Sequence, residues 1–286
     1  MQKVKVLSDS TCDLSKELLE EYSIDTVPLN ILMGEASYKD GVDVTSKEIF
    51  DWSDMNHTVP KTSAVSMPDT YNFIKKYVDE GYSIIYTGIG STLSATYSVL
   101  QLVREEFPEA DIRLIDSKNL STGTGLLVME AAVMAKNGFS AEEIEKRLQR
   151  MVPLVRATFV VDTPVYLHRG GRCSSVAAFA AGALNIKPMI SVKQDGTLAA
   201  TKKFRGKLES VMKKYVKHVV KHINAQERSH AFVTHTFLEG DIPERVAEMV
   251  RETNLFDEVY VTDAGGVISS HCGPGTLGVL YVEQGL

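Results

Sequence analysis

Ser83–Tyr97 reads SIIYTGIGSTLSATY, and this stretch indicates both the fold class and the kind of site that the chain carries. The apolar run Ile84–Tyr86 is typical of a buried strand, and a Gly-x-Gly turn and a hydroxyl-rich helix start follow it directly. A strand that turns at once into a helix is the repeating step of a parallel α/β sheet. Because a helix N-terminus presents unpaired N–H groups and a partial positive charge, this turn suits a small anion.

The same turn lacks the residues of the two common nucleotide-binding loops. No Lys follows the glycines, as the phosphate loop G-x-x-x-x-G-K-[ST] requires, and Leu93 stands where the dinucleotide fingerprint needs its third glycine. Hydroxyls and backbone amides remain, and these neutral donors are mild enough for a carboxylate. A second interpretation stays open, in which Ser91 and Ser94 only cap the helix.

The order of the expected elements predicts an α/β protein with two domains. In the first half, strands such as Val4–Leu7 and Ile112–Asp116 alternate with helices, which indicates a doubly wound, mostly parallel sheet. In the second half, Asp195-Gly196 between two extended runs predicts a hairpin, and hence a mixed or antiparallel sheet with helices. We place the domains at 1–157 and 158–286 and expect the ligand between them.

Four segments carry more local expectations. Lys61–Pro68 and Ser121–Gly125 are expected to be loops that precede helices. Ser174–Leu184 is expected to be a helix of small residues, and Val267–Val282 to be extended chain with a glycine-rich turn.

Size, charge and cysteine content exclude several classes of protein. The chain has 286 residues and a net charge of −6, which argues against nucleic acid as the main partner. Three cysteines without a Cys-x-x-Cys motif indicate reduced thiols, and the N-terminal MQKVKVLSDS reads as a strand rather than a signal peptide. No apolar run is long enough to span a bilayer. We therefore expect a cytoplasmic protein.

Two further groups could join the anion site. Thr62 and Ser63 lie in a hydroxyl-rich stretch before Pro68 and could donate hydrogen bonds to an oxyanion, although an ordinary helix cap has the same pattern. His271 lies in ISSHCGPGTLG, whose glycines and proline shape a loop around it. A histidine bonded to a backbone carbonyl is the plain alternative for this position.

Other reactive or charged side chains carry weaker predictions. His271 and Cys272 are adjacent, but neighbours on an extended segment point to opposite faces, so a nucleophile–base pair is not expected. No metal is predicted, since His218 and His222 share a helix face without a third ligand. The basic residues within His168–Lys207 are either a solvated surface or a docking surface for an acidic or phosphate-bearing partner.

With these residues in view, the chain resembles the DegV family of bacterial fatty-acid-binding proteins along nearly its whole length. Eight segments carry the resemblance, and they follow the family's order and spacing. They are DSTCDL at 9–14, YKDGVD at 38–43, Thr62-Ser63, STLSATY at 91–97, IDS at 115–117, YLHRGGR at 166–172, KPMISV with DG at 187–196 and HCGPGTLG at 271–278. Each segment alone is weak, but the eight together are specific.

The resemblance implies a carrier rather than an enzyme. Such a protein buries a long-chain fatty acid between two α/β domains and presents its carboxylate to a separate ATP-dependent fatty acid kinase. The acyl phosphate then enters phospholipid synthesis. No cofactor and no metal is implied beyond the bound fatty acid. We expect a monomer with no nucleic-acid partner, and a transient contact with the membrane is compatible with this role.

The resemblance also assigns roles to single residues. The side chains of Thr62 and Ser94 are expected to hydrogen-bond the carboxylate. Ser63 and the backbone N–H of Ala95 are expected to contribute, with His271 close by.

Outside this headgroup site, the assignments concern the tail and the partner. Phe179 lies in a run of small residues and is a candidate for the wall of the tunnel, although a plain buried helix has the same composition. The resemblance implies contact with the kinase at three arginines, which are Arg169, Arg172 and Arg205.

Two other functions stay open at this point. One is an acyl hydrolase or transferase that uses His271 with a serine such as Ser94. The other is a regulatory or adaptor module that acts through the basic residues.

Overall fold

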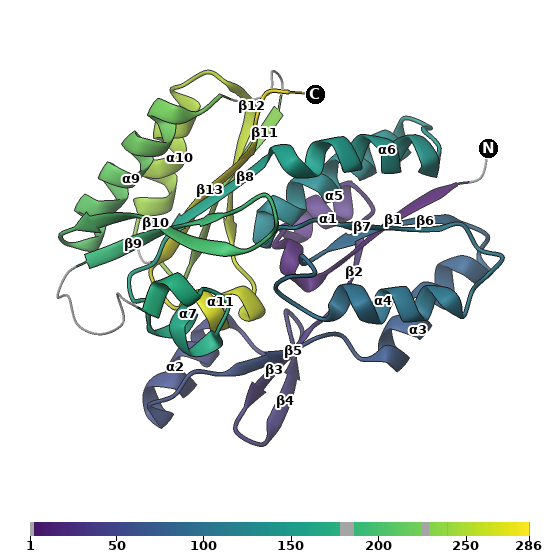
Figure 1. Cartoon of the computed structure of the whole chain (residues 1–286), viewed down its shortest axis with the longest axis horizontal. Helices are drawn as coiled ribbons and strands as arrows, with labels where there is room; N and C mark the ends of the chain where they lie inside the picture. The colour runs from purple at the N-terminus through teal and green to yellow at the C-terminus, as the bar shows by residue number, and fades with distance from the viewer. Residues whose placement is uncertain (1–2, 178–185, 225–228, 239, 286) are drawn as a thin grey trace.

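The computed structural model describes residues 3–177, 186–224, 229–238 and 240–285, and Figure 1 shows their arrangement. Most of the helix expected at Ser174–Leu184 therefore lies outside the described residues. Among the described helices, none is both long and apolar enough to cross a bilayer.

The N-terminal half contains the predicted parallel sheet. Its strands lie in the order β2 (Asp25–Val27), β1 (Val4–Asp9), β6 (Ser83–Gly88) and β7 (Ile112–Asp116), and each neighbouring pair is parallel. The chain proceeds from β1 to β2 on one side and later adds β6 on the other, so the strand order reverses between β1 and β6. Ligands of open α/β sheets bind outside the carboxyl ends of the strands at such a reversal.

Helices cover both faces of this sheet (Figure 1). They are α3 (Met67–Asp79) and α4 (Thr96–Glu105) on one face, and α1 (Lys16–Glu21), α5 (Ser121–Lys136) and α6 (Ala141–Met151) on the other. Leu7 and Ile84 pack into the cluster with α3 and α4, whereas Val6 and Ile85 pack into the cluster with α1, α5 and α6. The alternation follows from the two-residue period of a strand, and burial on both faces explains why the strands are apolar throughout.

The second half contains a mixed sheet, as predicted. Its strands lie in the order β10 (Leu198–Arg205), β9 (Ile186–Val192), β8 (Val155–Val160), β13 (Thr276–Val282), β11 (Ser229–Thr236) and β12 (Phe256–Asp263). Only the β11–β12 pair of this described sheet is parallel. The predicted hairpin joins β9 and β10, and Gly196 in its turn has a φ of 86°, which favours glycine. Helices α9 (Leu208–His222) and α10 (Ile242–Arg251) cover one face.

Helix α5 packs against both of these sheets. It contacts β1 and β6 of the parallel sheet and β8, β11 and β13 of the mixed sheet. Its residues 121–129, 131 and 132 are buried, as expected of a helix that is apolar on all sides. The division expected between residues 157 and 158 falls inside β8, and it stays a prediction.

A third, smaller sheet was not predicted. It is antiparallel, with the order β4 (Ala36–Lys39), β3 (Asn30–Met33) and β5 (Lys61–Ser63). The expectation of a loop at residues 61–63 was therefore wrong, because their backbone pairs with β3. This pairing places Thr62 opposite Ile31 and fixes the direction of the threonine side chain.

Two other local predictions were wrong. Ser121–Gly125 forms the first turns of α5 rather than a loop, and its glycines allow close packing: a Cβ on Gly125 would lie 2.8 Å from the carbonyl oxygen of Cys12. The first part of Val267–Val282 is a helix, α11 (Gly266–Cys272), rather than extended chain. The remaining described elements are η1 (Ser10–Cys12), α2 (Ser46–Asn56), η2 (Val152–Leu154), α7 (Val165–Gly170) and η3 (Ser174–Val176).

Candidate functional site

Three segments that are far apart in the sequence line one cavity. Thr62 and Ser63 come from β5, Ser94 and Ala95 from the start of α4, and His271 from α11. The cavity has a volume of about 160 Å³ and lies near the carboxyl end of β6, next to the reversal of strand order. The structure thus brings together all five residues expected around a carboxylate, and their role in binding it stays a prediction.

Thr62 and His271 form the central polar pair of the cavity. Oγ1 of Thr62 lies 2.7 Å from Nε2 of His271. The other ring nitrogen, Nδ1, is buried and has no hydrogen-bond partner among the described residues. If Nε2 carries the proton, the imidazole donates to Thr62, and the hydroxyl proton of Thr62 is free to donate to a ligand.

Burial keeps the imidazole of His271 neutral at pH 7. Burial first, and the positive charge of Arg172 second, lower the pKa of His271 to about 4. Gly170 makes this packing feasible, because a Cβ at that position would collide with Nδ1 of the ring. A carboxylate bound beside the ring would have the opposite effect, since a negative charge favours the imidazolium form.

The start of α4 adds backbone and hydroxyl groups. Ala95 is the N-cap and gives the helix no side-chain cap, and its own N–H has no backbone acceptor among the described residues. Oγ of Ser94 accepts a hydrogen bond from the N–H of Thr96 at 3.2 Å. Ser91 does not cap the helix, because its N–H and hydroxyl both bond to Asp116. The capping interpretation therefore holds in part for Ser94 and fails for Ser91.

Two buried aspartates hold the N-terminus of α11, the helix that carries His271. Oδ1 of Asp13 accepts from the N–H of Gly265 at 2.9 Å, and Oδ1 of Asp40 accepts from the N–H of Gly266 at 2.7 Å. Burial raises the pKa of both carboxyl groups. Their hydrogen bonds satisfy the first backbone donors of the helix and orient it toward β5.

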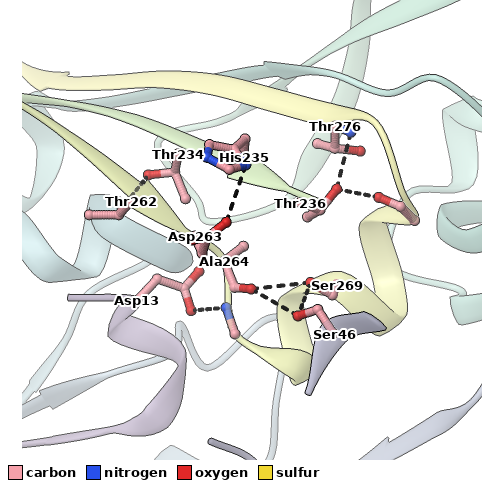
Figure 2. Close-up of polar contacts among 12 residues, drawn as sticks. Asp13, Ser46, Thr234, His235, Thr236, Thr262, Asp263, Ala264, Ser269 and Thr276 are labelled. Carbon is pink, nitrogen blue, oxygen red and sulfur yellow. Dashed lines mark hydrogen bonds and ion pairs between the residues drawn. The ribbon is translucent and has the colours of Figure 1, made fainter. Parts of the chain in front are cut away.

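Two serine hydroxyls also hold the turn that precedes α11. The hydroxyls of Ser46 and Ser269 both donate to the carbonyl oxygen of Ala264 at 3.2 Å, as Figure 2 shows. These supports were not predicted from the sequence. The signal was present in DSTCDL and YKDGVD, which contain Asp13 and Asp40, but a buried aspartate cannot be distinguished from a surface one by pattern alone.

The three arginines expected to contact a partner occupy different places. Arg172 is exposed, yet it lines the cavity and donates from Nη1 to the carbonyl of Gly170 at 2.6 Å. Arg169 lines a separate groove between α2 and α7, and Arg205 is exposed at the end of β10. The place of Arg172 in the cavity wall was not predicted from the sequence. Phe179 lies outside the described residues.

The cavity holds no activated nucleophile among the described side chains. Ser94 and His271 form no hydrogen bond with each other, and Nδ1 of the histidine has no carboxylate to orient it. Cys272 also lines the cavity, but burial raises the pKa of its thiol to about 12. No group of three or more His, Cys, Asp or Glu side chains in the described part of the chain could hold a metal ion.

The rest of the cavity wall is mostly hydrocarbon. Side chains from both halves of the chain contribute, including Leu29, Ile89, Leu93, Leu167 and Leu198. A few hydrogen-bond donors at one place in an apolar wall suit a ligand with a single polar group on a hydrocarbon body.

Comparison with known proteins agrees with this geometry. The family model described as "Uncharacterised protein, DegV family" matches residues 3–284. The chain belongs to the DegV family. A DegV domain-containing protein of Clostridium perfringens is 32% identical over 286 residues, covering 99% of this chain and 100% of the relative. A DegV domain-containing protein of Clostridium acetobutylicum is 32% identical over 288 residues, with the same coverage. The family resemblance stated from the eight segments is confirmed.

Solved DegV structures share the whole fold. A DegV family protein from Thermus thermophilus, described by its fatty acid binding, has a TM-score of 0.89 and 28% identity, and the match covers 98% of this chain and 100% of that one. A stearic-acid-binding protein from Eubacterium ventriosum has a TM-score of 0.85 and 29% identity, with 99% of each chain covered. These DegV neighbours bind fatty acids, and the α/β fold predicted from the sequence is confirmed.

Proposed function

We propose that this DegV protein binds a long-chain fatty acid, with the carboxylate held at Thr62, Ser94 and His271 and the chain buried in the apolar cavity. The observation that carries the proposal is the Thr62–His271 pair, 2.7 Å apart on the wall of an apolar cavity. The fatty acid ligands of the DegV neighbours support it.

The proposed headgroup site binds its anion with neutral donors. The hydroxyls of Thr62, Ser63 and Ser94 and the N–H of Ala95 can all point at one carboxylate, and the partial positive charge at the start of α4 favours it. A buried carboxylate is tolerable only with several donors aimed at it. Arg172 adds a full positive charge at the exposed side of the cavity.

The hydrocarbon chain would provide most of the affinity. At about 0.8 kcal/mol per buried CH₂, a chain of about sixteen carbons contributes on the order of 10 kcal/mol before the costs of ordering and association. The headgroup site then fixes the orientation of the ligand, and the shape of the cavity selects the chain.

The second part of the proposal is a carrier role. A cytoplasmic, monomeric carrier would present the carboxylate to a separate ATP-dependent fatty acid kinase, whose acyl phosphate product serves phospholipid synthesis. The absence of an activated nucleophile among the described cavity residues supports catalysis in a partner. Exposed Arg169, Arg172 and Arg205 would contact an acidic surface of that kinase.

Binding of palmitate, stearate and oleate to the delipidated protein tests the first part, with native mass spectrometry and calorimetry as readouts. Thr62→Val and Ser94→Ala each remove a donor to a charged group, so we expect binding to weaken by about tenfold to a hundredfold. Ser91→Ala is the matched control, because its hydroxyl bonds to Asp116 and lines no part of the cavity. Unchanged affinity in both Thr62→Val and Ser94→Ala would overturn the headgroup assignment.

The carrier role needs a separate measurement. Affinity capture from a bacterial lysate, followed by an assay for ATP-dependent phosphorylation of the bound acid, identifies the kinase. Reversal of charge in Arg172→Glu should abolish phosphorylation. A control titration shows whether that variant still binds the acid; if it does not, the arginine acts in the headgroup site instead.

A further inference from the structure

A second hollow, here called the lysine groove, lies where the two halves of the chain meet. The loop after β7, the start of β8 and the turn between β9 and β10 line it. Its volume is about 390 Å³, and it shares no lining residue with the headgroup cavity. The turn is held against the loop, because Thr92 donates to the carbonyl oxygen of Gly196 at 2.9 Å. The size of the groove suits a small organic ligand.

The side chains of the lysine groove are positively charged, although the chain as a whole has a net charge of −6. Lys118, Arg156 and Lys193 line the groove, and no Asp or Glu does. Arg156 is already neutralised by Glu283. The ammonium groups of Lys118 and Lys193 form no hydrogen bond or ion pair within the described part of the chain. Two positive charges therefore face each other across the groove without a counter-ion.

The carboxylates near these lysines have other hydrogen-bond partners. Asp116 accepts from the backbone N–H groups of Ser91 and Lys118 at 3.0 and 3.1 Å. Asp195 accepts from the N–H and the hydroxyl of Thr197 at 2.9 and 2.7 Å. Neither aspartate lines the groove, so both shape its turns and leave the two ammonium groups available to an anion.

Asn119 adds a neutral donor between the lysines. It lines the groove and is only 3% exposed. Its Oδ1 accepts from the N–H of Leu120 at 3.1 Å and faces Gly123, where a Cβ would collide with it. The other end of the amide, Nδ2, donates to no group in the described ranges. Because a nearly buried donor without an acceptor costs free energy, an acceptor atom in the groove would stabilise this side chain.

We propose that the lysine groove binds a small phosphate monoester. The phosphate group lies between Lys118 and Lys193 and accepts a hydrogen bond from Nδ2 of Asn119. A phosphate monoester has nearly two negative charges and three acceptor oxygens, which match two ammonium groups and one amide. The organic part packs on the apolar side chains of Val152 and Val155. This inference does not rest on the proposed function.

Calorimetric titration of the full-length protein with phenyl phosphate and with inorganic phosphate tests the site. Each titration is done with and without palmitate, because a phosphate bound in the headgroup cavity would compete with the fatty acid. We expect phenyl phosphate to bind with a Kd below about 10 mM, more tightly than inorganic phosphate, and equally well in both conditions. No binding of either probe, or competition with palmitate, would overturn the proposal. Equal affinity for both probes would overturn the contact with an organic group.

Two double variants separate this site from the general effect of charge. Lys118→Gln with Lys193→Gln removes both ammonium groups, so we expect binding to weaken by about tenfold or more. Lys217→Gln with Lys221→Gln is the matched control, because both lysines are exposed on α9 and neither lines the groove. The control should retain its affinity within about twofold. Equal losses in the two double variants would overturn the site.

Asn119→Asp provides an independent variant with nearly the same shape. It keeps an acceptor for the N–H of Leu120 and replaces Nδ2 with a negatively charged oxygen, which repels a phosphate. We expect binding of phenyl phosphate to be lost, while urea denaturation shows that the protein is folded. Unchanged affinity in folded Asn119→Asp would overturn the placement of the phosphate beside this side chain.

Discussion

Nε2 of His271 lies 2.7 Å from Oγ1 of Thr62, although 209 residues separate them in the chain. The histidine is on α11, which lies in the chain between β12 and β13 of the mixed sheet, and the threonine is on β5 of the small sheet. Neither half of the chain contains the pair alone. The headgroup site thus exists only when both halves are folded and packed together.

Gly170 controls the position of the imidazole. In Gly170→Ala, the added methyl group would collide with Nδ1 of His271, so we expect the contact with Thr62 to break and fatty acid binding to weaken by about tenfold. Overpacking should also lower the free energy of unfolding by about 1–3 kcal/mol. Calorimetric titration with palmitate measures the first effect and urea denaturation the second.

Gly171→Ala is the control for that experiment. No atom lies within 4 Å of a Cβ added there, but φ is 71°. We expect a loss of about 1 kcal/mol in stability and unchanged binding. Equal losses of affinity in the two variants would contradict a specific role of Gly170.

The histidine makes stability depend on pH. Its folded-state pKa, about 4, lies below the ordinary value of 6.5, so the unfolded chain binds a proton that the folded chain does not. The contribution of the neutral imidazole to the free energy of unfolding is complete above pH 6.5. It is lost as the pH falls toward 4, by up to about 3 kcal/mol. His271→Gln should therefore show a shallower fall in unfolding free energy over this range, measured by urea denaturation. Parallel pH profiles for both proteins would refute the assignment.

Asp40 tests the support of α11. In Asp40→Ala, the buried N–H of Gly266 loses its acceptor, so we expect the unfolding free energy to fall by about 1–3 kcal/mol and fatty acid binding to weaken. Asp40→Asn keeps an acceptor oxygen and should be milder in both respects. Asp51→Ala removes only an exposed ion pair with Lys47 and should change stability by about 0.5 kcal/mol or less. Asp40→Ala behaving like Asp51→Ala would argue against the anchoring role.

The cysteines should be unreactive in the folded protein. All three are buried and free, and burial raises the pKa of Cys12 and of Cys272 to about 12. Because the thiolate is the nucleophile, Ellman's reagent at pH 8 should release almost no colour until denaturant is added. A rapid stoichiometric reaction of the native protein would show that a thiol is accessible and would weaken the case against a cysteine nucleophile.

The elements with local signals were predicted from the sequence. The apolar run Ile84–Tyr86 and the helix after it predicted the parallel sheet. The Asp195-Gly196 turn predicted the hairpin of the mixed sheet. The small sheet escaped prediction because β3, β4 and β5 span only three or four residues each. Strands this short are defined by their long-range pairing, which periodicity does not record.

Helix α11 escaped prediction for a different reason. Glycine and serine near its start have low helix propensity, and the sequence reads GGVISSHCGPG. Tertiary contacts override that preference, because Asp13 and Asp40 accept the N–H groups at the start of the helix.

Several residues of the candidate site were predicted one by one, but the way in which the fold brings them together was predicted less completely. Hydroxyl-rich stretches pointed to Thr62 and Ser94, and the glycines around residue 271 pointed to the histidine. Arg172 was assigned only to a docking surface, because a basic residue on a turn gives no sign of lining a cavity. That placement depends on the path of α7, which brings Gly170 against the imidazole.

Helix α5 has a consequence for how a ligand enters. It is buried along most of its length and contacts both large sheets. A hinge motion that separated the sheets would expose this helix to water. The free-energy cost is about 25 cal/mol for each Å² of apolar surface exposed. The two halves of the chain are therefore coupled, and they should denature in one cooperative step. A hydrophobic ligand must then enter through local movement of the cavity wall and not through a hinge opening between the halves.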